Sequence, residues 1–237
     1  MSSNNQIVGP GVSGKAANFD AKNVSHETVV NELALLNLGD CIPLNISVDI
    51  HQFMSEIKAF DNDWVDYLPR TDRPNNRYGL VLKNLPGKGH QDNPSRAQAN
   101  SEAGRIISEL DFNSNTIVYE KCPSLHPLLN YFEPLGRTFL VKSNIGGYFV
   151  PHRDHPSMPR ESFRIAVFLN NCGPLEYDWF MESDTKLQFD LGRAYYINTR
   201  KTHRTISWVN DSIHLILNVP LNNENVAKVL ASLQHTH

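Results

Sequence analysis

The sequence predicts a mainly β protein with flanking helices, whose core is a jelly roll. Strand-like segments follow one another at short spacing from Arg137 onward, eight of them within about eighty residues, a density typical of barrels and jelly rolls. Before and after this region, apolar residues recur at helical spacing instead. A chain of 237 residues with 40% hydrophobic side chains is also long enough to bury the core of one domain.

The chain divides into a tail and a single domain. Residues 1–24 are rich in Ser, Asn and Gly with few large apolar side chains, so we expect a flexible tail. Residues 25–237 form the domain, with a helical and loop-rich part at 25–136, the jelly-roll core at 137–220 and a closing helix at 225–234. The strands expected in the core are RTFLVKS, YFVPHRD, SFRIAVFL, LEYDWFM, TKLQFD, RAYYINT, TISWV and SIHLILNV.

Helix signals mark the part before the core. Ser25 precedes a first helix and Asp49 a second, and both residue types favour helix N-termini. We expect a third, short helix around Ala103–Leu110, a strand over Arg77–Leu82, and a loop at PGKGHQDNPS between them. The residues at helical spacing in the first helix are Val29, Leu33 and Leu36.

Aromatic and basic residues gather between the second helix and the first strand. They could form one wall of a substrate site, or an ordinary aromatic-capped loop with solvated arginines. The residues concerned are Trp64, Tyr67, Arg70, Arg73 and Arg77.

Composition excludes several classes of protein. The net charge of -3 and the scattered basic residues do not favour a nucleic-acid partner. Apolar runs are strand-sized and the N-terminus lacks the apolar core of a secretory signal, so we expect a cytoplasmic protein without a membrane partner. Three widely spaced cysteines argue against a disulfide framework and against a cysteine-based zinc site.

The triplet His152-Arg153-Asp154, which follows a glycine turn and a short strand, is the clearest functional signal. On an extended strand alternate side chains share a face, so His152 and Asp154 point the same way. A second histidine from a distant strand would complete the two nitrogens and one oxygen of the facial triad found in non-haem Fe(II) oxygenases. A surface turn or a simple hydrogen-bonded pair would also be compatible with so short a motif.

Four histidines downstream could supply the third ligand. His203 is favoured because it lies in a loop after a strand, far enough beyond Asp154 for several strands to return it to the same end. His214 lies inside an apolar strand, where it would support the site, face an anion or be a satisfied core histidine. His235 and His237 lie in a terminus expected to fray. His155 would point away from His152 and is set aside.

Together, PHRD, FRIAVFLNN, the segment from Gly192 through RAYYINTRKT to His203, and IHLILNVP resemble the Fe(II)/2-oxoglutarate-dependent dioxygenases. They most resemble the aspartyl/asparaginyl β-hydroxylase-like branch, which also contains free-proline cis-hydroxylases. The resemblance covers residues 137–220 well and 64–82 loosely, and it implies a double-stranded β-helix, a distorted, cupin-like jelly roll. It also implies that His152, Asp154 and His203 bind Fe(II), with 2-oxoglutarate as cosubstrate.

One position departs from the family pattern. The family usually has an arginine shortly after the distal histidine, where it pairs with the far carboxylate of 2-oxoglutarate. Here Asp211 and Ser212 stand in that place, and the strand that follows contains no lysine or arginine. We expect Arg164 to take this role, because it alternates with an apolar set and its planar fork suits a carboxylate. Protonated His214, on the strand face of Ser212, would assist; alternatively, Arg164 is a solvated outward residue.

The resemblance implies an enzyme that hydroxylates an unactivated C–H and releases succinate and CO2. The substrate would be an amino acid or a peptidyl side chain of Asp, Asn or Pro type. Two alternatives stay open: a non-catalytic jelly-roll protein that binds a metal or small ligand, and an inactive member that has lost 2-oxoglutarate.

Overall fold

The structure, a computed structural model, describes residues 25–68, 75–154, 161–182 and 184–233. The expected tail at 1–24 and the expectations for Arg70, Arg73, His155, His235 and His237 lie outside these ranges. The strands are β1 (Cys41–Ser47), β2 (Val65–Asp66), β3 (Arg77–Asn84), β4 (Ser114–Asn115), β5 (Thr138–Ser143), β6 (Tyr148–His152), β7 (Ser162–Asn170), β8 (Tyr177–Met181), β9 (Arg193–Ile197), β10 (His203–Ser207) and β11 (Ser212–Pro220).

Helices occupy both ends of the chain and the region before the core. Ser25 and Asp49 cap the first two helices as expected, accepting hydrogen bonds from the backbone N–H of Thr28 and Gln52. The α-helices are α1 (His26–Leu36), α2 (Ile50–Ile57), α3 (Arg96–Ala103), α4 (Ile117–Lys121), α5 (His126–Tyr131) and α6 (Asn223–Ala231). Short 3-10 turns are η2 (Lys58–Phe60), η3 (Glu109–Asp111) and η4 (Pro123–Leu125).

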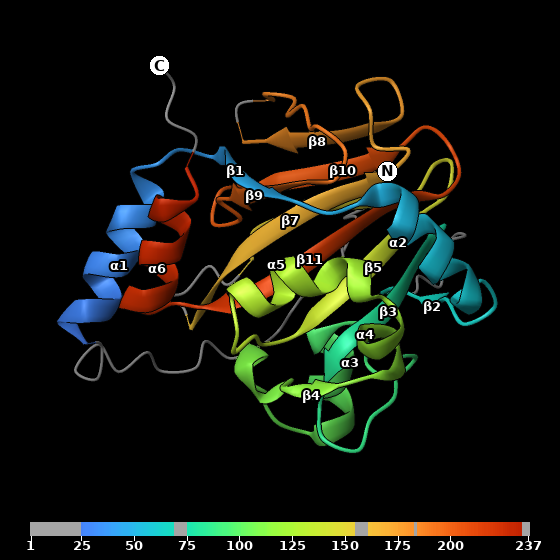
Figure 1. Cartoon of the computed structure of the whole chain (residues 1–237), viewed down its shortest axis with the longest axis horizontal. Helices are drawn as coiled ribbons and strands as arrows, with labels where there is room; N and C mark the ends of the chain where they lie inside the picture. The colour runs from blue at the N-terminus through green and yellow to red at the C-terminus, as the bar shows by residue number, and fades with distance from the viewer. Residues whose placement is uncertain (1–24, 69–74, 155–160, 183, 234–237) are drawn as a thin grey trace, which may run out of the picture.

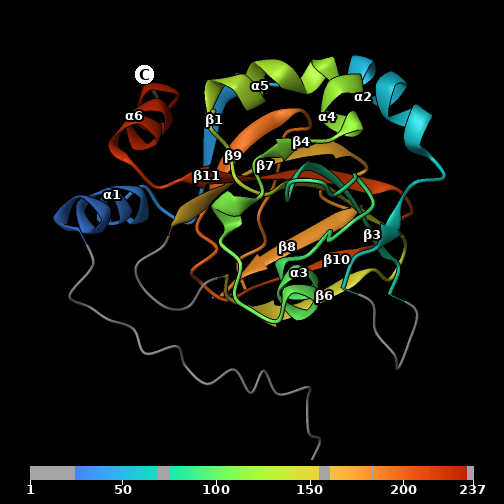
Figure 2. The same ribbon diagram turned by 90° about the horizontal axis from the view of Figure 1, so that it is seen from below.

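Two antiparallel sheets face each other and form the jelly roll. The large sheet has the order β1-β9-β7-β11-β5-β3-β2, with β4 paired to β3, and the small sheet has the order β6-β10-β8. Figure 1 and Figure 2 show α2, α4 and α5 over the outer face of the large sheet, and α1 beside α6 at one end. The expected fold class, a mainly β jelly roll with flanking helices, is therefore confirmed.

The large sheet separates two apolar clusters. Alternate residues of its strands point to opposite faces, so Leu140 and Leu215 pack under the helices while Phe139 and Ile216 face the small sheet. The cluster between the sheets is aromatic-rich, and Phe168 packs there against Trp179. A charged side chain on this inner face is consequently unusual and marks the site.

Three expectations about single elements differ from the structure. The helix expected at 103–110 is wrong: α3 ends at Ala103 because Gly104 adopts a left-handed conformation at φ 64°, and only η3 follows. TKLQFD is not a strand: Thr185 and Leu187 form backbone hydrogen bonds with β8 and Lys186 forms an isolated bridge, but the pairing goes no further, and Phe189 stacks on Phe168. In α1, Val29 and Leu33 are exposed.

None of the helices in the described part of the chain has the length and apolarity needed to span a bilayer.

Candidate metal centre

The small sheet brings the three expected metal ligands together. His152 ends β6 and His203 begins β10, and the two residues are direct partners in the antiparallel ladder. Asp154 follows β6 by two residues, and one possible ligand atom from each of the three residues lies within 4.8 Å of the others. His203 is thus at the same end of the jelly roll as His152, as the sequence predicted.

Backbone carbonyls orient both imidazoles. The Nδ1 atom of His152 lies 2.9 Å from the carbonyl oxygen of Val150, and that of His203 lies 3.0 Å from the carbonyl oxygen of Lys201. Because a carbonyl can only accept, each Nδ1 is the protonated donor, and Nε2 is the nitrogen left to ligate a metal. Two imidazoles oriented in this way fit a divalent cation.

Both the backbone and the side chain of Asp154 are held in place. The backbone N–H donates to the carbonyl oxygen of Thr199 at 2.9 Å. In the side chain, Oδ2 accepts from Arg164 Nε at 3.0 Å, while Oδ1 lies 3.6 Å from His152 Nε2. Burial alone would raise the pKa of Asp154, but the charge of Arg164, followed by His203 and His152, holds that pKa well below its usual range. The group is therefore an ionised ligand.

The protonation state of His152 also suits metal binding. Burial first, and the neighbouring His203 second, lower the pKa of His152 to about 4 from 6.5. At neutral pH the imidazole is uncharged and its Nε2 lone pair is available. The donor set of two imidazoles and one carboxylate fits Fe(II) in a facial arrangement.

A cavity of about 630 Å³ opens beside these ligands, between the two sheets. Its walls contain all three ligands and also Arg164 and His214. Of the residues proposed from sequence as a substrate wall, Tyr67 and Arg77 line it. Trp64 packs elsewhere, under Lys142. The apolar lining includes Phe139, Val141, Phe149, Ala166, Trp179, Ile197 and Ile216.

Arg164 faces inward, which excludes the reading of a solvated outward residue. Two carboxylates of the protein bind the Arg164 guanidinium. Its Nε donates to Oδ2 of Asp154, and its Nη2 lies 3.3 Å from Oε1 of Glu109, a residue only 1% exposed. Glu109 in turn accepts from Arg137 Nε at 2.7 Å. This geometry fits orienting Asp154, while Nη1 of Arg164 has no hydrogen-bond partner among the described residues, so the expected contact of Arg164 with the cosubstrate stays a prediction.

His214 and Ser212 are the other two residues expected at the cosubstrate. His214 lines the cavity, and burial, with Arg77 second, lowers its pKa to about 3, so its ring is neutral instead of the imidazolium expected; its contact with the cosubstrate stays a prediction. The hydroxyl of Ser212 donates to Asn171 at 2.6 Å and lies 2.8 Å from Ser207 Oγ. Ser212 is therefore occupied within the protein.

Arg77, expected from the sequence only as one possible member of a substrate wall, is a further charged residue of the cavity. It is 4% exposed, and its guanidinium carbon lies 4.0 Å from the ring centre of Phe149 and 4.8 Å from that of Tyr67. Burial lowers its pKa, and within the described ranges no carboxylate forms an ion pair with it. The available signal was alternation on β3, which places Arg77 with Gly79 on the face opposite Leu80.

Comparison with known proteins gives likenesses among solved structures only. No protein-family model matches the sequence, and no curated protein matches it. A Pseudomonas putida prolyl-4-hydroxylase is 10% identical, with 83% of this chain and 99% of that chain covered and a TM-score of 0.44. A 2OG-Fe(II) oxygenase family oxidoreductase from Burkholderia pseudomallei is 12% identical, with 84% and 93% covered and a TM-score of 0.43. A viral collagen prolyl hydroxylase from Paramecium Bursaria Chlorella virus-1 is 13% identical, with 76% and 94% covered and a TM-score of 0.40. The case for function rests on the residues of the site.

Proposed function

We propose that this protein is an Fe(II)- and 2-oxoglutarate-dependent dioxygenase that hydroxylates an unactivated C–H. The observation that carries the proposal is the convergence of His152, Asp154 and His203 at one end of the jelly roll, beside a cavity. In the balanced reaction, substrate C–H, O2 and 2-oxoglutarate give substrate C–OH, succinate and CO2. Bound Fe(II) would supply the activation of O2 that is coupled to this oxidative decarboxylation.

The three ligands have distinct supporting contacts. His152 and His203 would bind through Nε2, because their Nδ1 atoms are committed to carbonyls. Arg164 occupies Oδ2 of Asp154, which favours ligation through Oδ1. Three protein ligands on one face leave positions for the cosubstrate and O2.

Arg77 is the residue we assign to the far carboxylate of 2-oxoglutarate. A buried guanidinium without a carboxylate partner in the described part of the chain is costly, and an anionic ligand in the cavity would offset that cost. Arg77 packs on Phe149, which packs on His152 at 3.9 Å between ring centres, so the cation and the first ligand lie one ring apart. The neutral ring of His214 lines the same cavity.

The lining of the cavity suits oxidation of a C–H bond. Phe149, Trp179 and Ile216 surround the centre with apolar surface that excludes water from the reacting groups. The substrate we propose is an amino acid or a peptidyl side chain of Asp, Asn or Pro type. All three cysteines are free thiols, which suits the reducing cytoplasm, where Fe(II) persists.

Succinate formation with Fe(II) and 2-oxoglutarate, screened against amino acids and short peptides, tests the activity. Substrate-dependent succinate that disappears in Asp154→Ala supports a dioxygenase. Binding of metal and 2-oxoglutarate without succinate, for any substrate, would instead favour the non-catalytic binding protein.

Calorimetric titration of 2-oxoglutarate into the Ni(II) protein tests Arg77. Arg77→Met should weaken binding by about 2–5 kcal/mol, the range for truncating one member of a buried charge pair. The unloaded variant should be no less stable than the wild type, because an unpaired buried charge is removed and the methionine still packs on Phe149. Arg204→Met, which removes a half-exposed cation over the ring of Phe180, is the matched control. Unchanged affinity in Arg77→Met would move the carboxylate to another residue.

A further inference from the structure

Two of the three metal ligands depend on one short loop. This metal-supporting loop, residues 198–202, connects β9 to β10. The carbonyl of Thr199 accepts from the backbone N–H of Asp154 at 2.9 Å, and the carbonyl of Lys201 lies 3.0 Å from Nδ1 of His203. A shift of this loop would therefore move the backbone of one ligand and rotate the ring of another.

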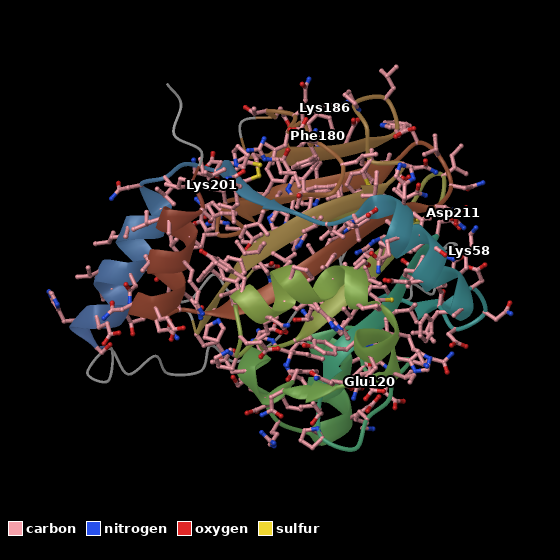
Figure 3. All side chains as sticks on the ribbon, viewed as in Figure 1. Lys58, Glu120, Phe180, Lys186, Lys201 and Asp211 are labelled. Atoms are coloured by element: carbon pink, nitrogen blue, oxygen red, sulfur yellow. The ribbon has the colours of Figure 1, made fainter. Side chains whose placement is uncertain are left out.

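The N-terminal part of the domain holds this loop in place. Arg200, at its centre, donates from Nη1 to Oε1 of Glu32 in α1 at 2.6 Å. Asp40, just after α1, accepts from the backbone N–H of Asn198 at 2.8 Å and from Nζ of Lys201 at 2.9 Å. Figure 3 places Lys201 at the end of the molecule near α1, and Asp211 at the opposite end.

The burial pattern of α1 is unusual for a helix that is held by apolar packing alone. Three of its apolar residues, Val29, Val30 and Leu33, are 37%, 48% and 51% exposed, whereas Glu32 is 3% exposed. Charged side chains are rarely buried without a specific partner. The face that α1 turns inward thus combines Leu35, which packs in the apolar cluster, with the buried carboxylate of Glu32 that pairs with Arg200.

We propose that Glu32 and Arg200 are positioning residues for the metal centre, so that α1 sets the geometry of Asp154 and His203 through the metal-supporting loop. This inference rests on the proposed function, because it requires that the three ligands bind a metal. Partners outside the ligand set typically contribute 10–100-fold to metal affinity. Loss of the Glu32 charge should act at the low end of that range, since it works through a loop.

Titration of the metal-free protein with Co(II), followed by the visible absorption of the bound ion, is the test. Glu32→Gln should weaken Co(II) binding about tenfold and alter the absorption spectrum of the bound ion. Glu224→Gln is the matched control: it removes a mostly exposed carboxylate, paired at 2.7 Å with Lys228, from the neighbouring helix α6, and it should change neither affinity nor spectrum.

A second variant keeps the test decisive if Glu32→Gln folds poorly. Arg200→Met removes the other partner, whose side chain is 22% exposed, and should give the same loss of affinity. Arg200→Lys, which preserves the charge, should recover part of it. Unchanged affinity and spectrum in a folded Arg200→Met protein, or a lower thermal stability without any change in Co(II) binding, would overturn the inference. A wild-type protein that binds no Co(II) would instead overturn the metal centre itself.

Discussion

At the scale of single residues, the centre depends on a network of carboxylates and guanidinium groups that form ion pairs with one another. Asp154 meets Arg164, Arg164 meets Glu109, and Glu109 meets Arg137. Removing Arg164 leaves Asp154 without this guanidinium and Glu109 with one cation fewer, which costs more than the pair contributes to stability. The structural role of Arg164 is therefore tested more directly by the free energy of unfolding than by the affinity for the cosubstrate.

Arg164→Met should lower the free energy of unfolding of the metal-free protein by about 3–5 kcal/mol, the range for breaking a buried ion pair. Urea denaturation measures this change. Arg204→Met, which removes a cation whose partner Asp184 is largely exposed, should cost less than about 1 kcal/mol. Equal, small losses of stability in the two variants would show that Arg164 does not stabilise the fold through this ion-pair network.

Because His214 is neutral in the folded protein, we expect the free energy of unfolding to depend on pH. Its pKa is about 3 in the folded chain and 6.5 ordinarily, so between these values the unfolded chain binds a proton that the folded chain does not. The free energy of unfolding should thus fall as pH is lowered below about 6.5, by up to about 1.4 kcal/mol per unit for this group. Urea midpoints at pH 7, 6 and 5 measure the slope. His214→Gln should have a shallower slope, and identical slopes would contradict a buried neutral imidazole.

The sequence predicted the three candidate ligands but not the role proposed here for Arg77, for a physical reason. His152 and Asp154 are two residues apart, so strand alternation alone places them together, and a loop after a strand accounts for His203. Arg77 and Arg164 lie on different strands, and both face the cavity. Which one meets a carboxylate of the chain depends on Glu109, from a 3-10 turn that no local pattern connects to β7.

At the scale of elements, the strands with strong alternation were predicted well and the segments fixed by tertiary contacts were not. β5, β7 and β11 follow RTFLVKS, SFRIAVFL and SIHLILNV closely. TKLQFD alternates equally well, but only its first half pairs with β8, and Phe189 beyond it stacks on Phe168 at 3.5 Å between ring centres. In the same way, Gly104 ended α3 and removed the helix expected after it.

Gly192, at the turn into β9, shows how closely elements meet. Its φ of +80° is unfavourable for other residues, and an added Cβ would lie 2.7 Å from the carbonyl oxygen of Val48. Gly192→Ala should therefore lower stability by about 1–3 kcal/mol, as measured by urea denaturation. Gly89→Ala, where the nearest atom would lie at an ordinary 3.5 Å, is the control. A neutral Gly192→Ala would mean that the β1 and β9 connection relaxes freely.

At the scale of the whole molecule, the two packed sheets form a rigid core, and the surrounding helices contact the residues around the candidate metal centre. The large sheet is held by an apolar cluster on each face, whereas the small sheet, which carries His152 and His203, is covered by the large sheet on one side. The ligands therefore stand at the edge of the best-packed part of the fold. Contacts from α1 and η3 to Arg200 and Arg164 fix their surroundings.

Metal binding should consequently stabilise the entire domain, because the unfolded chain does not hold the three ligands together. At a free Co(II) concentration one hundred times the Kd, binding adds about 2.7 kcal/mol to the free energy of unfolding. For a chain of this size that corresponds to a rise of roughly 5–11 °C in Tm. Differential scanning calorimetry with Co(II), and again after EDTA, measures the rise and its reversal. Asp154→Ala, which removes a ligand at a strand end and little of either apolar cluster, should keep a cooperative transition but gain no Tm from Co(II). A rise in that variant equal to the wild type would place the stabilising metal elsewhere in the molecule.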